Sequence, residues 1–459
     1  MESLSGLEEY YYYRSGLSYH SCFYVAIRLK KSPTNDELEG AIKATISKYP
    51  QLYSNAFEEH GTVTLRSLSN QITVLDVLET VDFESMSEDF NNYVFRNQNF
   101  PFGVEKPLWK ILALKDRRTL VFCTDHLIAD GMSTVSFWKS MMTNLNNPAH
   151  SGPLDGVVYR PSAQKFEVPQ HLYDSIKYSF AGIFLCVCIR FMVLLTYLKV
   201  DLLWKVLAPE LTDEDLKFKK YHFPQGLLTS AGAIRNDNLQ LNLNIPSSKL
   251  KLLLKKCKSH KVSLTSLITA VIAHSLQTVP ASQVEGSCIK ITIPMSTRES
   301  LQKITGASPA MMEFGNFIKG GEFFRDLLKL TQLWETAASL NSELVSQKND
   351  DDALQKIKLL SLVDVKKYVL AKVEARYPAS TFEVTNLGYQ SFDCGEDDKY
   401  IVEDAFFNEP QGINDVFTCS TVATPKGGLN CWFSYPKDIC ADFQPAIEYI
   451  QRVLYGLCE

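Results

Sequence analysis

The sequence lacks the features that mark several large classes of protein. Its 11 cysteines form no Cys-x-x-Cys pair and no spacing typical of metal ligands, and an odd count without a disulfide framework favours reduced thiols. The formal net charge is −5, which argues against nucleic acid as the main partner. The first residues, Met-Glu-Ser-Leu, lack the positive charge and apolar core of a secretory signal. We therefore expect an intracellular chain that binds neither a metal ion nor nucleic acid.

What the sequence does contain is a globular composition in a long chain. It has 459 residues, of which 45% are hydrophobic and 22% charged. A chain of this length exceeds one ordinary hydrophobic core, so we expect two lobes. Helical and strand patterns alternate in both halves, which predicts an α/β (α+β) fold. The predicted divisions are a first lobe over 1–160, a linker over 161–236 and a second lobe over 237–459.

Apolar spacing predicts the individual elements. In the first lobe the predicted strands are 19–29, 62–68, 72–75, 108–114 and 119–123, and the predicted helices are 36–49, 84–97 and 132–145. In the second lobe the predicted strands are 239–245, 289–295, 380–387, 400–407, 418–423 and 429–435, and the predicted helices are 249–258, 264–279, 322–346 and 442–457. We expect Asn35 and Ser263 to cap the helices that follow them, and the Gly- and Pro-containing stretch near 151–169 to be a linker.

A proton-transfer residue, a carboxylate and a glycine coincide in one run, His126-Leu-Ile-Ala-Asp130-Gly131. Chance would supply a histidine, three residues and then Asp-Gly only about 0.02 times in a chain of this composition. The run follows a predicted strand and precedes a predicted helix, a position from which side chains reach cavities. Two interpretations stay open on these grounds: His126 is a general base, or it caps an ordinary turn.

The motif and the two α/β lobes resemble the CoA-dependent acyltransferase superfamily, the chloramphenicol acetyltransferase-like group with the His-x-x-x-Asp-Gly motif. Within it the chain looks most like the fungal alcohol acetyltransferase family and its N-acetyltransferase relatives. Shorter segments support this resemblance: Gly6-Leu-Glu-Glu-Tyr10, Pro294-Met-Ser-Thr-Arg298, Phe314-Gly-Asn316, Thr385-Asn-Leu-Gly388 and Gly428-Leu-Asn430. The Asp-Phe-Gly-Trp-Gly motif of plant and condensation-type members is absent, which argues against plant-type chemistry.

The resemblance implies a two-lobed fold with mixed sheets and a tunnel between the lobes. It implies acetyl-CoA as co-substrate, no metal, and His126 as the base that removes a proton from the acceptor. Asp130 would pair with an arginine and fix the loop, with Arg298 and Arg14 as the two candidates. Gly131 would permit a tight turn, and Asn386 is a candidate oxyanion donor or substrate contact, with an ordinary turn role as the alternative.

The most apolar stretch, 180–198, is close to the length of a membrane-spanning helix. Arg190 at its centre makes a true span costly, by about 3 kcal/mol. Three interpretations compete: a helix lying on a membrane surface, a buried crossover helix, and a span. The first is favoured, and it predicts peripheral contact with the cytoplasmic face of the endoplasmic reticulum or with a lipid droplet; otherwise we expect the chain in the cytoplasm.

The leading functional hypothesis is O-acetylation of a hydrophobic alcohol by a monomeric enzyme. The first alternative is N-acetylation of a lipid-like or sphingoid-type amine, including detoxification of such a compound, because His126 would serve either acceptor. The second alternative is a non-catalytic module that binds lipid. The sequence alone does not choose between the hydroxyl and the amine.

Overall fold

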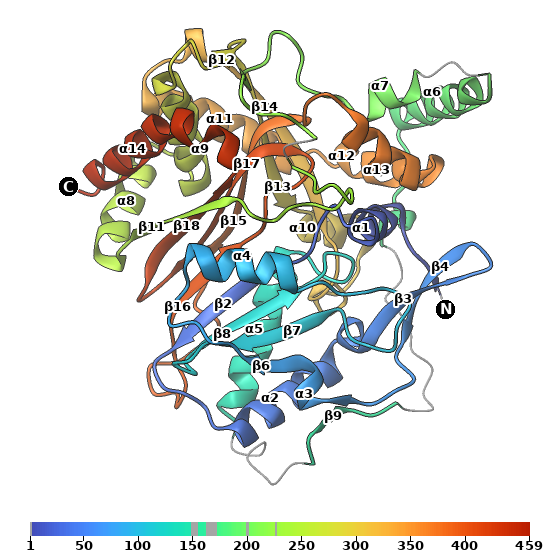
Figure 1. Ribbon diagram of the computed structural model, residues 1–459, viewed down its shortest axis with the longest axis vertical. Coiled ribbons are helices and arrows are strands. Elements are labelled where there is room, and N and C mark those ends of the chain that lie inside the picture. The colour runs from blue at the N-terminus through green and yellow to red at the C-terminus, as the bar shows by residue number, and fades with distance from the viewer. Residues whose placement is uncertain (1, 148–154, 162–171, 199–201, 225–226) are drawn as a thin grey trace.

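The computed structural model describes residues 2–147, 155–161, 172–198, 202–224 and 227–459. Two separate sheets organise the chain, one in each half of the molecule in Figure 1. The mixed α/β, two-lobed architecture matches the expected fold class. Most of the stretch predicted as a linker, 151–169, lies outside the described residues.

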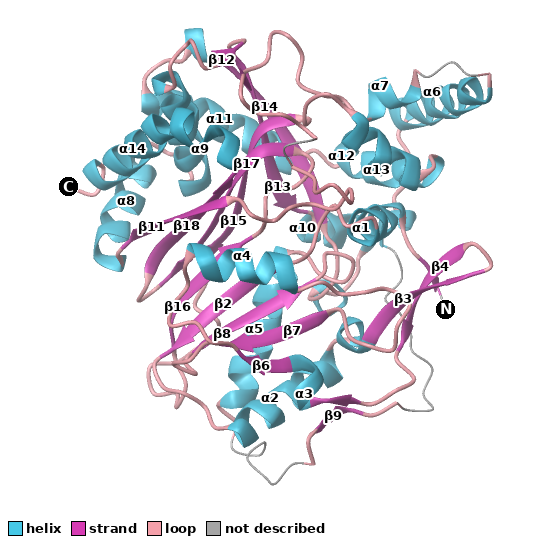
Figure 2. Cartoon of the chain, in the orientation of Figure 1, coloured by secondary structure: helices cyan, strands magenta, loops and turns pink. Residues whose placement is uncertain are grey.

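The first sheet has five strands and carries helices on both faces (Figure 2). Its order is β16 (Val402–Asn408), β2 (Phe23–Leu29), β8 (Thr119–Thr124), β7 (Trp109–Ala113) and β6 (Leu78–Thr80), antiparallel except for β6 with β7. Val25 and Ile27 point to the main core that includes α5 (Gly131–Leu145), whereas Tyr24 and Ala26 face α4 (Glu88–Asn97). Because both faces are covered, β2 is an almost continuous apolar run.

The second sheet has six strands and is covered by helices from the second half of the chain. Its order is β11 (Leu239–Ile245), β18 (Gly428–Tyr435), β17 (Asp415–Thr424), β15 (Ser380–Tyr389), β13 (Cys288–Ser296) and β14 (Ile318–Asp326). Helix α9 (Leu264–Ser275) packs on β15 and contacts α11 (Leu333–Lys348) and α14 (Cys440–Gly456). This sheet mixes parallel and antiparallel pairs, since β13, β15 and β17 run parallel.

The remaining elements complete the frame around these sheets. They include α1 (Gly6–Gly16), α2 (Asn35–Lys48), β3 (Ser54–Glu59), β4 (Thr62–Ser67), β5 (Ile72–Thr73), α3 (Val74–Val77), β9 (Val157–Tyr159), α6 (Phe180–Tyr197), α7 (Leu203–Leu207), α8 (Ser247–Ser259), α10 (Arg298–Thr305), α12 (Asp352–Lys358), the 3₁₀ helix η7 (Leu359–Leu362) and α13 (Val365–Glu374). Short pieces are β1 (Glu2–Ser3), β10 (Lys217–Phe218), β12 (Val284–Glu285), η1 (Pro50–Tyr53), η3 (Leu172–Ser175), η4 (Leu276–Thr278), η5 (Pro309–Met312), η6 (Leu327–Lys329) and η8 (Lys437–Ile439).

Most predicted elements are present, and three predictions were wrong for identifiable structural reasons. The helix expected over 322–346 is a strand, β14, followed by α11, because alternate β14 side chains are buried at the edge of the sheet. The strand expected over 72–75 ends at Thr73 and continues as the helical turn α3. Thr34 rather than Asn35 caps α2, because Thr34 and Glu37 form a reciprocal capping box. The cap predicted at Ser263 is confirmed.

Strand β16 belongs to the first sheet although it comes from the predicted second lobe. It pairs with β2 through residues such as Phe406 opposite Ala26. Asn430 of β18 donates a hydrogen bond to the Ala405 carbonyl at 2.8 Å, so β16 is also attached to the second sheet. The chain therefore crosses between the two sheets, and the residue after this strand, Glu409, lies between them. The predicted boundaries at 160 and 237 stay predictions.

A buried ion pair joins the two halves of the chain. Arg298 donates from Nη1 to Asp130 Oδ2 and from Nη2 to Asp130 Oδ1, both at 2.8 Å. Asp130 also accepts from the Ser133 backbone at 2.8 Å and from the Phe317 backbone at 2.9 Å. Burial opposes ionisation of Asp130, but the charge and hydrogen bonds of Arg298 outweigh it and lower the pKa of this carboxyl.

Further hydrogen bonds extend this pair into a latch, by which we mean Asp130, Ser133, Arg298, Gly315 and Phe317. The Ser133 hydroxyl donates to the Gly315 carbonyl at 2.8 Å, and the Gly315 N–H donates back to it at 3.0 Å. Arg298 also donates from Nε to the Met312 carbonyl at 2.7 Å. Each partner of Asp130 is therefore itself held, which gives the pair a fixed geometry.

We predict that Arg298→Met destabilises the protein by about 3–5 kcal/mol, because the variant leaves the Asp130 carboxylate buried without a countercharge. Urea denaturation at pH 7 measures the loss. The matched control is Arg325→Met, which breaks a two-point pair with the half-exposed Glu343 and should cost about 0–1 kcal/mol. Equal losses in the two variants would contradict the importance assigned to the buried pair.

Candidate active site

The structure places His126 just beyond the end of β8, at the junction between the two sheets. The loop is fixed from both sides: Asp125 accepts a hydrogen bond from the Leu127 N–H at 2.7 Å. Asn316 of the other half donates from its amide to the His126 carbonyl at 2.7 Å and to the Leu127 carbonyl at 3.0 Å. Asn316 lies in the Phe314-Gly-Asn316 segment that the sequence marked only as supportive.

Aromatic rings surround the imidazole of His126, which is 9% exposed. The Phe23 ring stacks at 4.0 Å between centroids and the Tyr11 ring at 5.0 Å, while His20 lies tilted at 5.4 Å. Burial lowers the pKa of His126 below its usual 6.5, the nearby Glu409 carboxylate opposes this, and the positive charge of Arg14 lowers the pKa further. The ring is therefore neutral at pH 7, which is the form that accepts a proton.

Glu409 is the carboxylate beside His126, and sequence reasoning missed it. Its Oε2 lies 3.8 Å from His126 Nε2, and both side chains are largely buried. The other oxygen, Oε1, has no hydrogen-bond partner among the described residues. No local motif marks Glu409, because only the crossing of β16 between the sheets brings it to the histidine.

A cavity of about 220 Å³ opens beside these side chains. Its apolar wall includes Phe23, Met132, Ile318, Leu387 and Phe407, and its polar wall includes Arg14, His126, Glu383, Thr385, Asn386 and Glu409. Of the residues predicted from sequence, the structure brings His126, Gly131, Arg14 and Asn386 to this cavity. Asp130 and Arg298 instead form the latch behind it.

Arg14 does not pair with Asp130, so the structure selects Arg298 from the two candidates. The Arg14 guanidinium lies over the Tyr11 ring at 4.9 Å and over the Tyr10 ring at 5.7 Å. Its Nε and Nη2 have no hydrogen-bond partner within the described ranges, although the residue is only 8% exposed. Arg14 therefore contributes a buried positive charge to the cavity rather than to the latch.

Gly131 and Asn386 hold local positions that differ from the predicted ones. Gly131 begins α5 and does not adopt a left-handed turn; a side-chain carbon at this position would lie 2.7 Å from Leu387 Cδ2. Asn386 donates from its amide to Thr265 at 2.9 Å and accepts from the Gly388 N–H at 2.7 Å. These bonds engage the Asn386 side chain in the strand-end turn, as the alternative interpretation expected.

Glu383 is a second carboxyl group that the sequence did not indicate. It lines the same cavity as Glu409. Burial raises the pKa of Glu383 well above its usual range, and the neighbouring charges of Glu409 and Asp415 raise it further. These causes favour the protonated form of the Glu383 carboxyl group.

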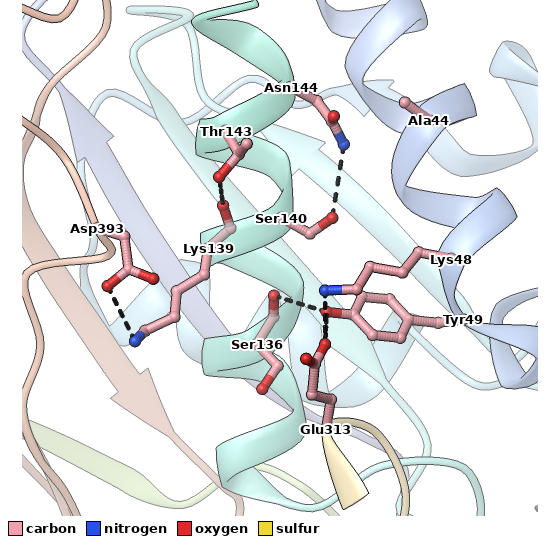
Figure 3. A pocket seen from close by; sticks show the side chains of 10 residues that line it. All are labelled: Ala44, Lys48, Tyr49, Ser136, Lys139, Ser140, Thr143, Asn144, Glu313 and Asp393. Atoms are coloured by element: carbon pink, nitrogen blue, oxygen red, sulfur yellow. Dashed lines mark hydrogen bonds and ion pairs between the residues drawn. The ribbon is translucent and has the colours of Figure 1, made fainter. Parts of the chain in front are cut away.

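A larger cavity of about 490 Å³ lies between α2 and α5, and its lining residues are labelled in Figure 3. The lysines that line it are already paired: Lys48 contacts Glu313 at 2.5 Å and Lys139 contacts Asp393 at 3.0 Å. This larger cavity holds no residue of the His126 motif, so the smaller cavity is the candidate active site. Across the described ranges, no group of three or more His, Cys, Asp or Glu side chains is arranged to hold a metal ion.

Comparisons with known proteins agree on one family. The family described as alcohol acetyltransferase matches residues 3–84 and 70–454. The chain is 31% identical to the N-acetyltransferase SLI1 of Saccharomyces cerevisiae over 475 residues, with 98% of each chain covered.

Solved structures share the fold at low identity. The trichothecene 15-O-acetyltransferase TRI3 of Fusarium sporotrichioides superposes with a TM-score of 0.71 at 11% identity, covering all of this chain and 94% of that one. The epimerization domain of tyrocidine synthetase B gives a TM-score of 0.62 at 13% identity, covering 99% and 96%. The chain therefore is an acetyltransferase and belongs to the alcohol acetyltransferase family.

Proposed function

We propose that this enzyme transfers the acetyl group of acetyl-CoA to the hydroxyl of a hydrophobic alcohol, with His126 as general base in a ternary complex. The observation that carries the proposal is the buried imidazole of His126 lining a cavity that has an apolar wall opposite its polar side chains. The family match supports acetyl-CoA as donor and a small-molecule acceptor. Monomeric state and the absence of metal chemistry stay predictions.

In the proposed reaction, His126 Nε2 takes the hydroxyl proton while the acceptor oxygen attacks the thioester carbonyl. The new carbon–oxygen bond forms as the carbonyl becomes an oxyanion, and collapse of this intermediate breaks the carbon–sulfur bond. The protonated imidazole then returns its proton to the CoA sulfur, so His126 ends neutral. Phe23 and Tyr11 stack on the His126 ring and fix its orientation. The proposed reaction forms no covalent acyl-enzyme intermediate.

A second candidate function is acetylation of an amine, and Glu409 favours it. An amine is positively charged at neutral pH, and the Glu409 carboxylate beside His126 offers a countercharge in a low-dielectric site. Glu383 would add a protonated carboxyl group next to it. The relative from yeast is named as an N-acetyltransferase, which supports this candidate as well.

We predict that His126→Ala lowers kcat/KM by about 10²–10⁴-fold, because the attacking atom loses its base. Release of free CoA thiol measures the rate with a branched short alcohol, a long-chain alcohol, a sterol and a sphingoid base. His274→Ala is the matched control, since His274 is also buried but bonds only Thr336 in another part of the protein. Near-normal turnover in His126→Ala would show that another group takes the proton.

The pH dependence follows from the lowered pKa of His126. The neutral ring is the active form, so activity is fully present well above the lowered pKa and falls as the pH drops through it. We expect the acid limb of kcat/KM for an alcohol acceptor to have its midpoint below pH 6.5. A midpoint above 6.5 would be inconsistent with a base desolvated by burial.

Glu409→Gln distinguishes the two acceptors. If an amine is the acceptor, kcat/KM for the amine should fall at least about 10-fold more than for an alcohol of the same shape, because only the ammonium loses its countercharge. The acid limb of the alcohol reaction should move to lower pH, since Glu409 raises the pKa of His126. Equal losses for both acceptors would remove the argument for an amine.

A further inference from the structure

Helix α6 is exposed although it is the most apolar helix of the protein. It is the one helix among the described residues that is long and apolar enough to cross a membrane, yet only 11% of that window is buried. With α7 it projects from the body beside α12 and α13 (Figure 1). The active site uses none of its residues, so its composition needs another explanation.

Most of the exposed apolar residues of α6 form one stripe. At about 100° per residue, the outward stripe is centred on Phe180 and Leu198, and the buried Ile189 lies on the opposite side. Members of the outward stripe are Phe180, Ile183, Phe184, Val187, Phe191, Leu194 and Leu198, each more than one-third exposed. Arg190 lies on the flank, roughly 80° from the centre of the stripe. This is the arrangement of a helix that lies in an interface, with its charge at headgroup level.

The attachment of α6 decides between the three interpretations that the sequence left open. At its start, the Ser179 N–H donates to Gln355 Oε1 at 2.8 Å. Beyond its end, Leu203 of α7 packs with Ile189 and Leu359 in one cluster. Both ends are thus held by the same body, which a helix crossing a bilayer does not permit, and its low burial excludes a crossover helix within the core.

The charged side chains of α6 and α7 are positive. Arg190 and Lys205 are exposed, as is Lys177 just before α6, and the nearest acidic residues in the sequence are Asp174 and Asp201. Tyr197 and Trp204 lie at the end of α6 and in α7, and such side chains favour the membrane interface. An anionic lipid surface complements this combination of apolar stripe and positive flank.

We propose that α6 and α7 dock the enzyme onto the surface of an anionic phospholipid bilayer, with α6 lying in the plane of the interface. The exposed stripe enters the boundary between headgroups and acyl chains, and Arg190, Lys177 and Lys205 contact lipid phosphates. The docking does not depend on which acceptor the enzyme uses. It is compatible with the predicted location on the endoplasmic reticulum, which stays a prediction.

The test is flotation of the full-length protein with vesicles of phosphatidylcholine alone or with 30% phosphatidylserine. We expect the wild type to float, more strongly with the anionic vesicles. The double variant Phe184→Asp with Phe191→Asp should lose at least about 100-fold in partitioning, since two exposed aromatic anchors are removed. The matched control, Leu75→Asp with Leu328→Asp, changes two leucines that are each 84% exposed elsewhere and should float as the wild type does.

Two further measurements test the role of the positive charge and the alternative that a second copy covers the stripe. Arg190→Glu should weaken binding to the anionic vesicles by about 5-fold or more and leave binding to neutral vesicles unchanged. Sedimentation without lipid tests whether a second copy covers the stripe instead. A wild-type dimer that the double variant converts to a monomer, or flotation that the double variant retains, would overturn the proposal; unchanged thermal unfolding of the variants excludes loss of fold as the cause.

Discussion

The buried pair between Asp130 and Arg298 is the constraint on which the site depends. A carboxylate out of water is stable only when a countercharge and further hydrogen bonds satisfy it, and here Ser133 and Phe317 supply bonds to Asp130 while the Met312 carbonyl holds Arg298. The pair joins the two halves of the chain, and its aspartate lies four residues after His126. It therefore fixes where the loop that carries His126 meets the second half of the chain, beside the cavity.

The candidate active site places charged and titratable side chains in a buried environment. Burial keeps His126 neutral, while Glu409 beside it limits how far the pKa of the ring falls. The raised pKa of Glu383 disfavours a second carboxylate charge in the cavity, and Arg14 adds a positive charge from α1. The cavity therefore sets several polar and charged side chains opposite an apolar wall.

Helix α6 differs from the other apolar helices in where its apolar side chains lie. Elsewhere apolar helices such as α9 are enclosed, whereas α6 turns its widest apolar stripe outward. The 3₁₀ helix η7 contacts both α6 and α1, and residues of α1 line the reaction cavity. Membrane docking would therefore hold the lipid surface close to one wall of the active site, a suitable arrangement for acceptors that dissolve in membranes.

The sequence by itself indicated the family, the candidate general base and most elements, because these depend on local patterns: the motif around His126, strand periodicity and the apolar run of α6. It failed at β14, whose sheet-edge position overrides its helical spacing. Only the tertiary structure chose Arg298 over Arg14, because a pair formed across 168 positions leaves no local signal. Glu409 lies beside His126 only because β16, from the second half of the chain, joins the first sheet next to β2. Strand order in the sheet, not spacing in the sequence, makes these two residues neighbours.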